Sequence, residues 1–221
     1  MIATLKPELK KPDVFYPERD EEPLGETDFH AHETIGLFQA LNSFFKAEPD
    51  VYVATDNFIY YVEGKPSAVI SPDVYVVKGV EKKRRRIYQL WKEDGHVPGV
   101  VFEITSSSSK KLDLGDKKTT CEMLGVREYF LFDPLGEYLK PVLRGFRLQQ
   151  GHYLEIAPSA GGELFSEELQ LNFSSQTPGY LRVINPRTGK VLPRYEEMDA
   201  KLNAAEAEVE RLRAELSKLK K

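Results

Sequence analysis

The middle of the chain constrains the fold more than any other part. Residues 99–105 form the most continuous apolar run, as expected for a strand buried on both faces of a sheet. A helical pattern follows over about 112–124 and ends at Gly125, where a left-handed residue commonly closes a helix. Residues 128–133 form a second apolar run, which Pro134 stops. This order predicts two parallel strands joined by a crossover helix, and therefore an α/β fold.

Segments on either side extend this centre. Apolar residues recur with helical spacing over 29–45, and Thr27 or Asp28 is placed to cap that helix. Residues 51–62 are rich in β-branched and aromatic side chains, which favour strands. Residues 143–192 contain short apolar segments between Gly and Pro turns. We expect them to be antiparallel strands that extend or cover the sheet.

The two ends of the chain differ from this domain over 29–192. Residues 1–28 combine prolines with many charges, which predicts an extended arm. Over 193–221 apolar residues alternate spacings of four and three, a heptad pattern typical of a coiled-coil helix. The apolar positions are Met198, Leu202, Ala205, Val209, Leu212, Leu216 and Leu219. Such a helix either pairs with a second copy, giving a homodimer, or packs back on the domain.

Composition narrows the chemistry. A length of 221 residues suits one substantial domain with an appendage. Cys121 is the only cysteine, so an intrachain disulfide and a thiolate-rich zinc site are excluded, and any metal must be held by oxygen or histidine. Residues 1–7 lack the features of a secretory signal, and no apolar run approaches the ~20 residues that cross a bilayer. A cytoplasmic location is the expectation.

Charge neither requires nor excludes a nucleic acid partner. The net charge of −4 gives no overall attraction to phosphate. A local cationic run nevertheless stands in the segment 78–98, and local fields govern contact with a phosphate backbone. The run consists of Lys82, Lys83, Arg84, Arg85 and Arg86. It is a candidate phosphate contact, and a solvated loop is the alternative.

Two carboxylates and a lysine stand where the predicted elements converge. Asp73 follows Pro72 at the start of a β-branched segment, and Glu103 lies at the end of the central strand. If these strands are neighbours, both carboxylates meet at one sheet edge, where a divalent cation would offset their repulsion. Magnesium suits two carboxylates, a backbone carbonyl such as that of Ile104, and waters. Lys117, on the following helix, could bring an ammonium group there.

The same three residues also have a purely structural explanation. Asp73 would cap a strand, Glu103 would be ion-paired at a sheet end, and Lys117 would be solvated.

Four sequence segments occur in a distinctive order. They are SPDV at 71–74, PGVVFEITS at 98–106, DLGDK at 113–117 and GVREYFLFDP at 125–134. Together they resemble the Uma-type family of putative restriction endonucleases, within the PD-(D/E)XK nuclease superfamily, over about 29–192. The resemblance implies a restriction-endonuclease-like core of helix, mixed central sheet and crossover helix. It also implies a divalent metal, Mg²⁺ or Mn²⁺, at Asp73 and Glu103.

The sequence departs from the superfamily pattern at one position. The usual lysine lies two residues after the glutamate, where this chain has Thr105, and Lys117 resembles a lysine relocated to the helix. Asp113 also fits the family pattern, although capping of the helix before Lys117 is the preferred explanation. Ser106 could donate to a phosphate or simply belong to a serine loop.

Four further residues have two interpretations each. His32 lies where the resemblance places a histidine, and it could contact substrate or orient a carboxylate. A solvent-facing or helix-capping role is at least as consistent, and still more so for His30. Glu33 is either an extra acid near the metal or a first-turn glutamate favoured by the helix dipole. Glu128 is expected to pair with a basic side chain, and Cys121 to be a core residue rather than a nucleophile.

The leading hypothesis is a metal-dependent endonuclease that hydrolyses DNA, with RNA not separated from DNA by these motifs. A homodimer is expected because two strand cuts are naturally made by two active sites. The rival is a catalytically inactive, nuclease-like module that binds DNA or a protein and dimerises through its C-terminal helix. Thr105 and the acidic pI of 5.7 motivate the rival.

Overall fold

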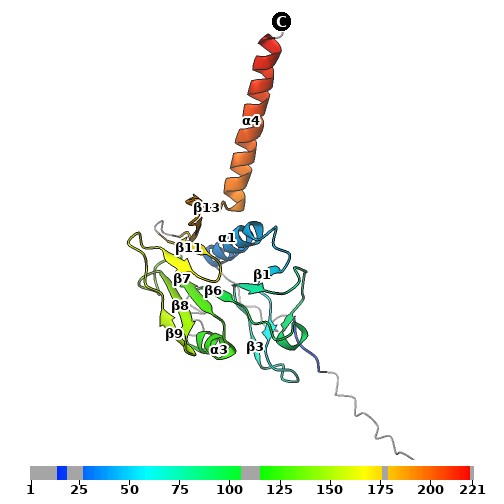
Figure 1. The fold of residues 1–221 in the computed structure, drawn as a ribbon, viewed down its shortest axis with the longest axis vertical. Coiled ribbons are helices and arrows are strands. Elements are labelled where there is room, and N and C mark those ends of the chain that lie inside the picture. The colour runs from blue at the N-terminus through cyan, green and yellow to red at the C-terminus, as the bar shows by residue number, and fades with distance from the viewer. Residues whose placement is uncertain (1–13, 19–26, 106–114, 176–178, 220–221) are drawn as a thin grey trace, which may run out of the picture.

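A computed structural model describes residues 14–18, 27–105, 115–175 and 179–219 (Figure 1). The fold is mixed α/β. Helix α1 (Asp28–Phe44) contributes Leu37 and Leu41 to one hydrophobic cluster, while helix α3 (Asp116–Leu124) contributes Cys121 to another. Alternate residues of the central strands enter the two clusters, so the two helices cover opposite faces of one sheet.

That sheet has six strands in the order β1-β4-β6-β7-β8-β9. The strands are β1 (Val51–Thr55), β4 (Val74–Lys78), β6 (Val100–Ile104), β7 (Glu128–Phe132), β8 (Leu143–Gln149) and β9 (His152–Glu155). Strands β6 and β7 are parallel, and the other neighbours are antiparallel. Helix α3 lies between β6 and β7 in the chain, which confirms the predicted parallel pair. The left-handed Gly125, with a φ of 84°, closes α3 as expected.

A second sheet covers the α1 side of the first. Its four antiparallel strands are β10 (Leu164–Ser166), β11 (Leu171–Ser174), β12 (Arg182–Asn185) and β13 (Lys190–Val191). Phe173 of β11 packs against Phe102 and Phe130, with ring centroids 5.0 and 5.1 Å away. The strands predicted over 143–192 therefore both extend and cover the central sheet.

A small third sheet lies beside β1. It contains β3 (Val69–Ile70), β2 (Ile59–Tyr60) and β5 (Tyr88–Gln89), and the short helix η1 (Leu90–Lys92) follows it. Residues 14–18 of the N-terminal arm pack here: the Tyr60 hydroxyl donates to the Pro17 carbonyl at 2.6 Å, and the Tyr16 ring lies 4.9 Å from that of Tyr60. This part of the arm is docked on the domain.

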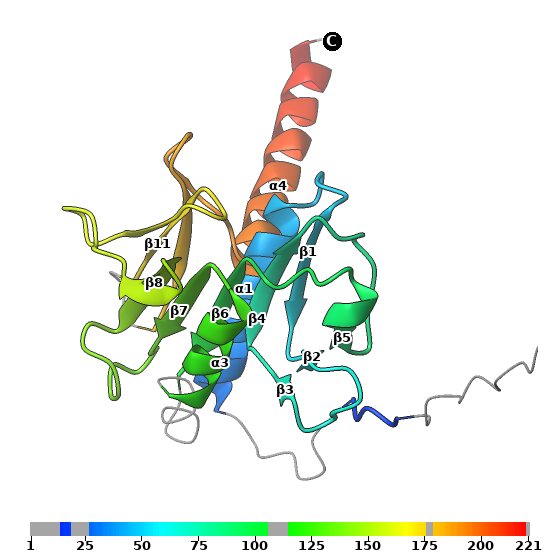
Figure 2. The same cartoon turned by 60° about the horizontal axis from the view of Figure 1, so that its bottom comes forward.

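The two terminal helices of the fold are anchored differently. Helix α1 starts after Thr27, whose hydroxyl accepts the His30 amide at 3.3 Å, as the sequence predicted. Helix α4 (Tyr195–Leu219) touches the body only near its start and projects away from it (Figures 1 and 2). Among the described helices, none combines the length and the apolar character that a membrane span requires.

Candidate active site

Antiparallel pairing of β4 with β6 brings the two predicted carboxylates to one place. Val74 pairs with Phe102, so the next step of the same register sets Asp73 opposite Glu103. Alternation along β6 assigns Glu103 to the face that α3 covers, whereas Asp73 stands at the bend just before β4. Both residues are buried, with 7% and 1% of their surface exposed. The sheet edge thus holds two buried carboxylates, whose loss of hydration must be offset by hydrogen-bond donors or by a cation.

Asp73 is held from two directions. Its Oδ2 accepts the backbone N–H of Ile104 at 2.5 Å, and the Nε2 of His30 lies 3.2 Å from the same oxygen. Its carbonyl accepts the Thr55 hydroxyl at 2.7 Å. Strands β1 and β6 and helix α1 therefore fix the position of this carboxylate.

Glu103 is held by the crossover helix. The Nζ of Lys117, in the first turn of α3, lies 2.9 Å from Oε2 of Glu103. One turn later Cys121 is fully buried, and burial raises the pKa of its thiol, with Glu103 adding to the effect and Lys117 opposing it. The predicted core role of Cys121 fits this position, because a protonated buried thiol is not a nucleophile.

The residue in the usual lysine position is also buried. Thr105 is 2% exposed, its N–H donates to Phe132 at 2.7 Å, and its hydroxyl has no hydrogen-bond partner among the described residues. The N–H of Thr105 points to β7, whereas that of Ile104 points to Asp73. The Ile104 carbonyl shares the side of its own N–H, so it lies along the edge occupied by Asp73.

The donor chemistry of this edge fits a hard divalent cation. No group of three His, Cys, Asp or Glu side chains capable of holding a metal occurs within the described ranges. Magnesium does not need three, because it is usually bound through one or two carboxylates and keeps several waters. Asp73, whose carboxylate accepts the amide of the residue after Glu103, together with Glu103 and a backbone carbonyl beside them, meets that requirement.

His30 is the site residue that sequence reasoning missed. The expectation of a solvent-facing side chain is wrong, because His30 is only 4% exposed and contacts Asp73. The helical spacing of the sequence could have indicated that His30 is buried. Thr34, Leu37 and Leu41 follow His30 at spacings of four, seven and eleven, and all four residues lie on the buried face of α1.

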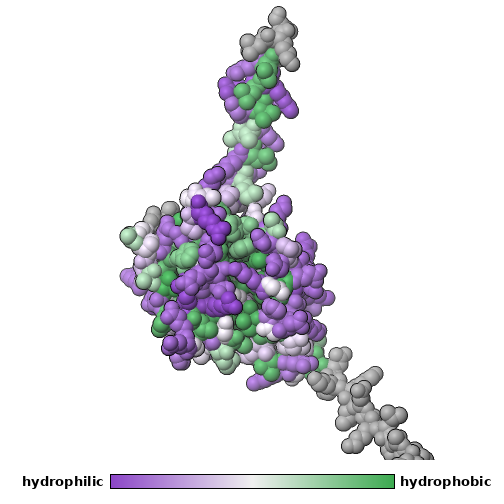
Figure 3. All heavy atoms as spheres, viewed as in Figure 1, coloured by the Kyte–Doolittle hydropathy of each residue, from purple (hydrophilic) through white to green (hydrophobic). Residues whose placement is uncertain are grey.

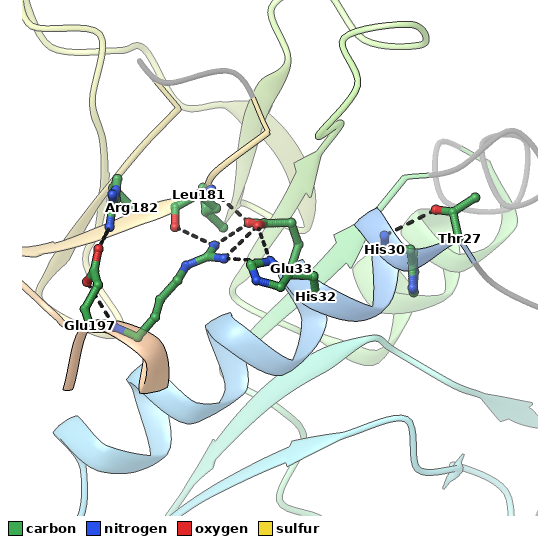
Figure 4. A network of polar contacts seen from close by, with 8 residues as sticks. Thr27, His30, His32, Glu33, Leu181, Arg182 and Glu197 are labelled. Atoms are coloured by element: carbon green, nitrogen blue, oxygen red, sulfur yellow. Dashed lines mark hydrogen bonds and ion pairs between the residues drawn. The ribbon is translucent and has the colours of Figure 1, made fainter. Parts of the chain in front are cut away.

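Glu33 and His32 belong to a different network, shown in Figure 4. Both oxygens of Glu33 bind the Arg194 guanidinium, with the Nη1 to Oε1 distance at 2.7 Å, and Oε2 also accepts the Leu181 amide at 2.9 Å. His32 Nδ1 lies 3.3 Å from Arg194 Nη1. The structure therefore places these two residues with Arg194 rather than with Asp73, contrary to the role considered for them beside the metal.

This network depends on a close approach of helix and guanidinium. A Cβ at Gly36 would stand 3.0 Å from Arg194 Cζ, so a larger residue there would require the guanidinium to shift from its position against α1. Glu33 and Arg194 are 161 residues apart in the chain. Their bond joins α1 to the residue that precedes α4.

The cationic run divides into bound and exposed members. Arg85 forms two hydrogen bonds to Glu93 at 2.7 and 2.8 Å, lies 4.4 Å from the ring centroid of Tyr52, and has a side chain only 5% exposed. These hydrogen bonds lower the pKa of the Glu93 carboxyl. Arg85 is therefore a structural residue, which corrects its assignment as a phosphate contact.

The other four members of the run differ from Arg85 in their contacts or their exposure. Lys82 donates to the Phe45 carbonyl, Lys83 pairs with Glu81 at 2.9 Å, and Arg86 donates to Glu18 at 2.6 Å. Arg84 is exposed.

A groove of about 520 Å³ lies between this segment and strand β1. Lys83 and Arg84 line one part of it, and Thr55, whose hydroxyl donates to Asp73, lines another. Strand β1 is the edge strand of the central sheet, so the groove is open to solvent along it.

Three further residues were singled out in the sequence. Asp113 and Ser106 lie outside the described residues. Glu128 is fully buried; its Oε1 accepts Arg147 Nε at 2.9 Å and the Glu167 amide at 2.9 Å. Glu128 thus pairs with a basic side chain, as expected.

Comparison with known proteins gives a family match. A family described as "Uma2: Putative restriction endonuclease" matches residues 10–181. No curated protein matches the chain. A crystal structure of a putative nuclease belonging to DUF820, from Anabaena variabilis, aligns with a TM-score of 0.47 at 15% identity, covering 66% of this chain and 76% of that one.

Proposed function

The chain belongs to the Uma2 family of putative restriction endonucleases, and from that premise we propose that it is a metal-dependent endonuclease that hydrolyses DNA. One observation carries the proposal. The Asp73 carboxylate accepts the amide of Ile104, the residue after Glu103, and Lys117 reaches Glu103 from the adjoining helix. Burying two carboxylates costs stability, and a cation bound between them would offset the repulsion between their charges.

The proposed metal is Mg²⁺, with Mn²⁺ as a substitute. Asp73, Glu103 and the Ile104 carbonyl would hold it, and when bound it would polarise a phosphoryl oxygen and lower the pKa of a water ligand. The core around these residues is proposed to be restriction-endonuclease-like.

The protein's own groups would act around the scissile phosphate. In hydrolysis a water oxygen forms a bond to phosphorus, the bond to the leaving sugar oxygen breaks, and that oxygen takes up a proton. Lys117 is placed to stabilise the negative charge that develops on the phosphate, while Glu103 holds its ammonium in position. His30 and the Ile104 amide orient Asp73. In this proposal Lys117 takes the role of the lysine whose usual position is occupied by Thr105.

The first experiment compares substrates under matched metal conditions. Purified protein is incubated with supercoiled plasmid, linear duplex, single-stranded DNA and RNA in Mg²⁺, in Mn²⁺ and in EDTA. We expect cleavage of DNA that EDTA abolishes. Metal-independent DNA binding with no cleavage of any substrate would instead favour the inactive nuclease-like module. Preferential cleavage of RNA would replace DNA as the substrate.

Substitution of Lys117 distinguishes a loss of catalysis from a loss of metal binding. Lys117→Met should lower the cleavage rate by about 10² to 10³, the range expected when one charge-stabilising donor is removed. Mn²⁺ affinity, measured by calorimetry, should not fall, because the carboxylates remain. Lys118→Met is the matched control: this neighbouring lysine packs 3.9 Å above the Phe146 ring and should leave cleavage within a few-fold of the parent. Equal loss in both variants would contradict the assignment.

The exposed part of the cationic run is proposed to contact DNA along the groove. Replacing Lys83 and Arg84 with alanine should weaken binding of every duplex sequence alike, and should reduce the slope of log K against log salt by about one per lost phosphate contact. Fluorescence anisotropy between low and moderate salt measures both effects. Arg187→Ala, at an exposed position outside this groove, is the control. An unchanged salt slope would exclude the groove as the DNA path.

A further inference from the structure

Helix α4 carries an apolar stripe that the described part of the chain does not cover. Its larger side chains retain about half of their surface, with 45% exposed for Met198, Val209 and Leu212, and 57% for Leu202 and Leu216. Figure 3 shows apolar surface, in green, among hydrophilic surface, in purple, along the projecting helix. A 25-residue helix of this kind is about 37 Å long and gains its stability mainly by burying such a stripe.

The start of α4 fixes its direction. Glu197, in the first turn, binds Arg182 of β12 at 2.5 Å, and Arg194 is buried against α1 just before the helix. A hollow between β13 and α4 is lined on the helix side by Glu197, Ala200, Lys201 and Ala204. None of these belongs to the apolar stripe, so the stripe lies on a different side of α4 from the hollow.

Heptad positions follow from the spacing. Leu202, Val209 and Leu216 occupy a positions; Met198, Ala205 and Leu212 occupy d positions. Val209 at a, followed by Leu212 at d, is the combination that favours two-stranded parallel coils.

The charges beside the stripe select one orientation. In a parallel pair, a g residue meets the e residue five positions later on the other helix. Lys201 then meets Glu206, and Glu208 meets Arg213; the sequence continues with Glu215 and Lys220. Every such pair is of opposite sign. Glu208 and Arg213 also have partners on their own helix, but these exposed pairs are weak and can rearrange.

Antiparallel pairing is complementary only in part: where the helices overlap fully, Lys201 would meet Glu215, but Glu206 and Glu208 would each meet their own copy. There g residues face g residues, so in the two registers with the greatest overlap Glu208 would face Glu208 or Glu215 of the second copy. Like charges in those positions are destabilising. We infer that α4 joins two copies of this chain in a parallel, two-stranded coiled coil, with opposite charges at the e and g positions fixing the register.

A parallel coil sets both domains at one end. Each domain would adjoin Tyr195 at the base of the coil, related by a twofold axis along it. Helix α3, which carries Lys117, lies at the end of the body away from α4 (Figure 1). Both acidic edges would then face away from the coil, toward the two strands of one duplex. This last step rests on the proposed function; the coil itself does not.

Crosslinking of the full-length chain tests the orientation. In a parallel pair each a residue faces its own copy, so Leu202→Cys should form a disulfide-linked dimer under mild oxidation. Ala207→Cys lies at f, on the outer side of the coil, and should stay monomeric on a non-reducing gel. Cys121 is buried and should not contribute. A dimer by sedimentation that is not crosslinked by Leu202→Cys would overturn the parallel arrangement.

Charge exchange tests the register without relying on a thiol. Glu206→Lys places lysine four residues before Glu210, which favours the isolated helix, yet in the parallel coil it faces Lys201. It should weaken dimerisation about tenfold, because symmetry repeats each lost pair. Lys201→Glu together with Glu206→Lys should restore the parental affinity. A chain that sediments as a monomer at 100 μM, or a double variant that is not restored, would refute the inference; both readouts are independent of cleavage.

Discussion

Glutamine at position 103 should abolish metal-dependent cleavage. Glu103→Gln keeps the shape of a side chain that is 1% exposed, but it removes one of the two charges proposed to hold the cation. Because metal assistance is worth several kcal/mol and each 1.36 kcal/mol is tenfold in rate, we expect a loss of at least about 10³ in the cleavage rate. A plasmid-nicking time course in Mg²⁺ measures it.

The control for this substitution is Glu137→Gln, the same change at an exposed glutamate. It should cleave like the parent. Thermal melting must show that Glu103→Gln is folded, since the substitution removes the negative charge beside Lys117, whose side chain is only 20% exposed. Folded Glu103→Gln protein with parental activity would remove Glu103 from the site.

The largest effect on stability is expected at Arg194. Arg194→Ala leaves Glu33, whose side chain is 1% exposed, as a buried carboxylate without its cation. Breaking a buried pair on one side costs about 3–5 kcal/mol. Urea denaturation should show this decrease in the free energy of unfolding.

Two comparisons isolate the cause. Arg182→Ala removes a half-exposed pair with Glu197, whose side chains are 33% and 38% exposed, and should cost at most about 1 kcal/mol. Replacing both Glu33 and Arg194 with methionine should recover much of the lost stability, because no buried charge is then left unpaired. If the double variant is no more stable than Arg194→Ala, lost packing rather than an isolated charge is the cause.

The sequence predicted the elements that bring the site together. An apolar strand, a helix closed by Gly125 and a second strand specified the parallel centre, because each has a strong local signal. Asp73 and Glu103 could then be placed at one edge from strand ends alone. The contact of Lys117 with Glu103 could be anticipated because the helix follows the strand closely in the sequence, with the two residues 14 positions apart.

Contacts between distant segments were beyond sequence reasoning. The partner of Glu33 comes from residue 194, and nothing local to α1 indicates an arginine there. Arg85 looked like its neighbours in a cationic run, and only its packing on Tyr52 and its bonds to Glu93 distinguish it. His30 was misassigned for a different reason: its helical face was readable, but a histidine near a helix start was assumed to be solvated.

The proposed metal site can be tested most directly by anomalous scattering. Crystals grown with Mn²⁺ should show one strong anomalous peak between the carboxylates of Asp73 and Glu103, within about 2.3 Å of an oxygen from each, with Lys117 directed toward the same space. Crystals of Glu103→Gln under the same conditions should lose that peak. A well-ordered site without a peak at full Mn²⁺ loading, or with a peak only elsewhere, would contradict the account.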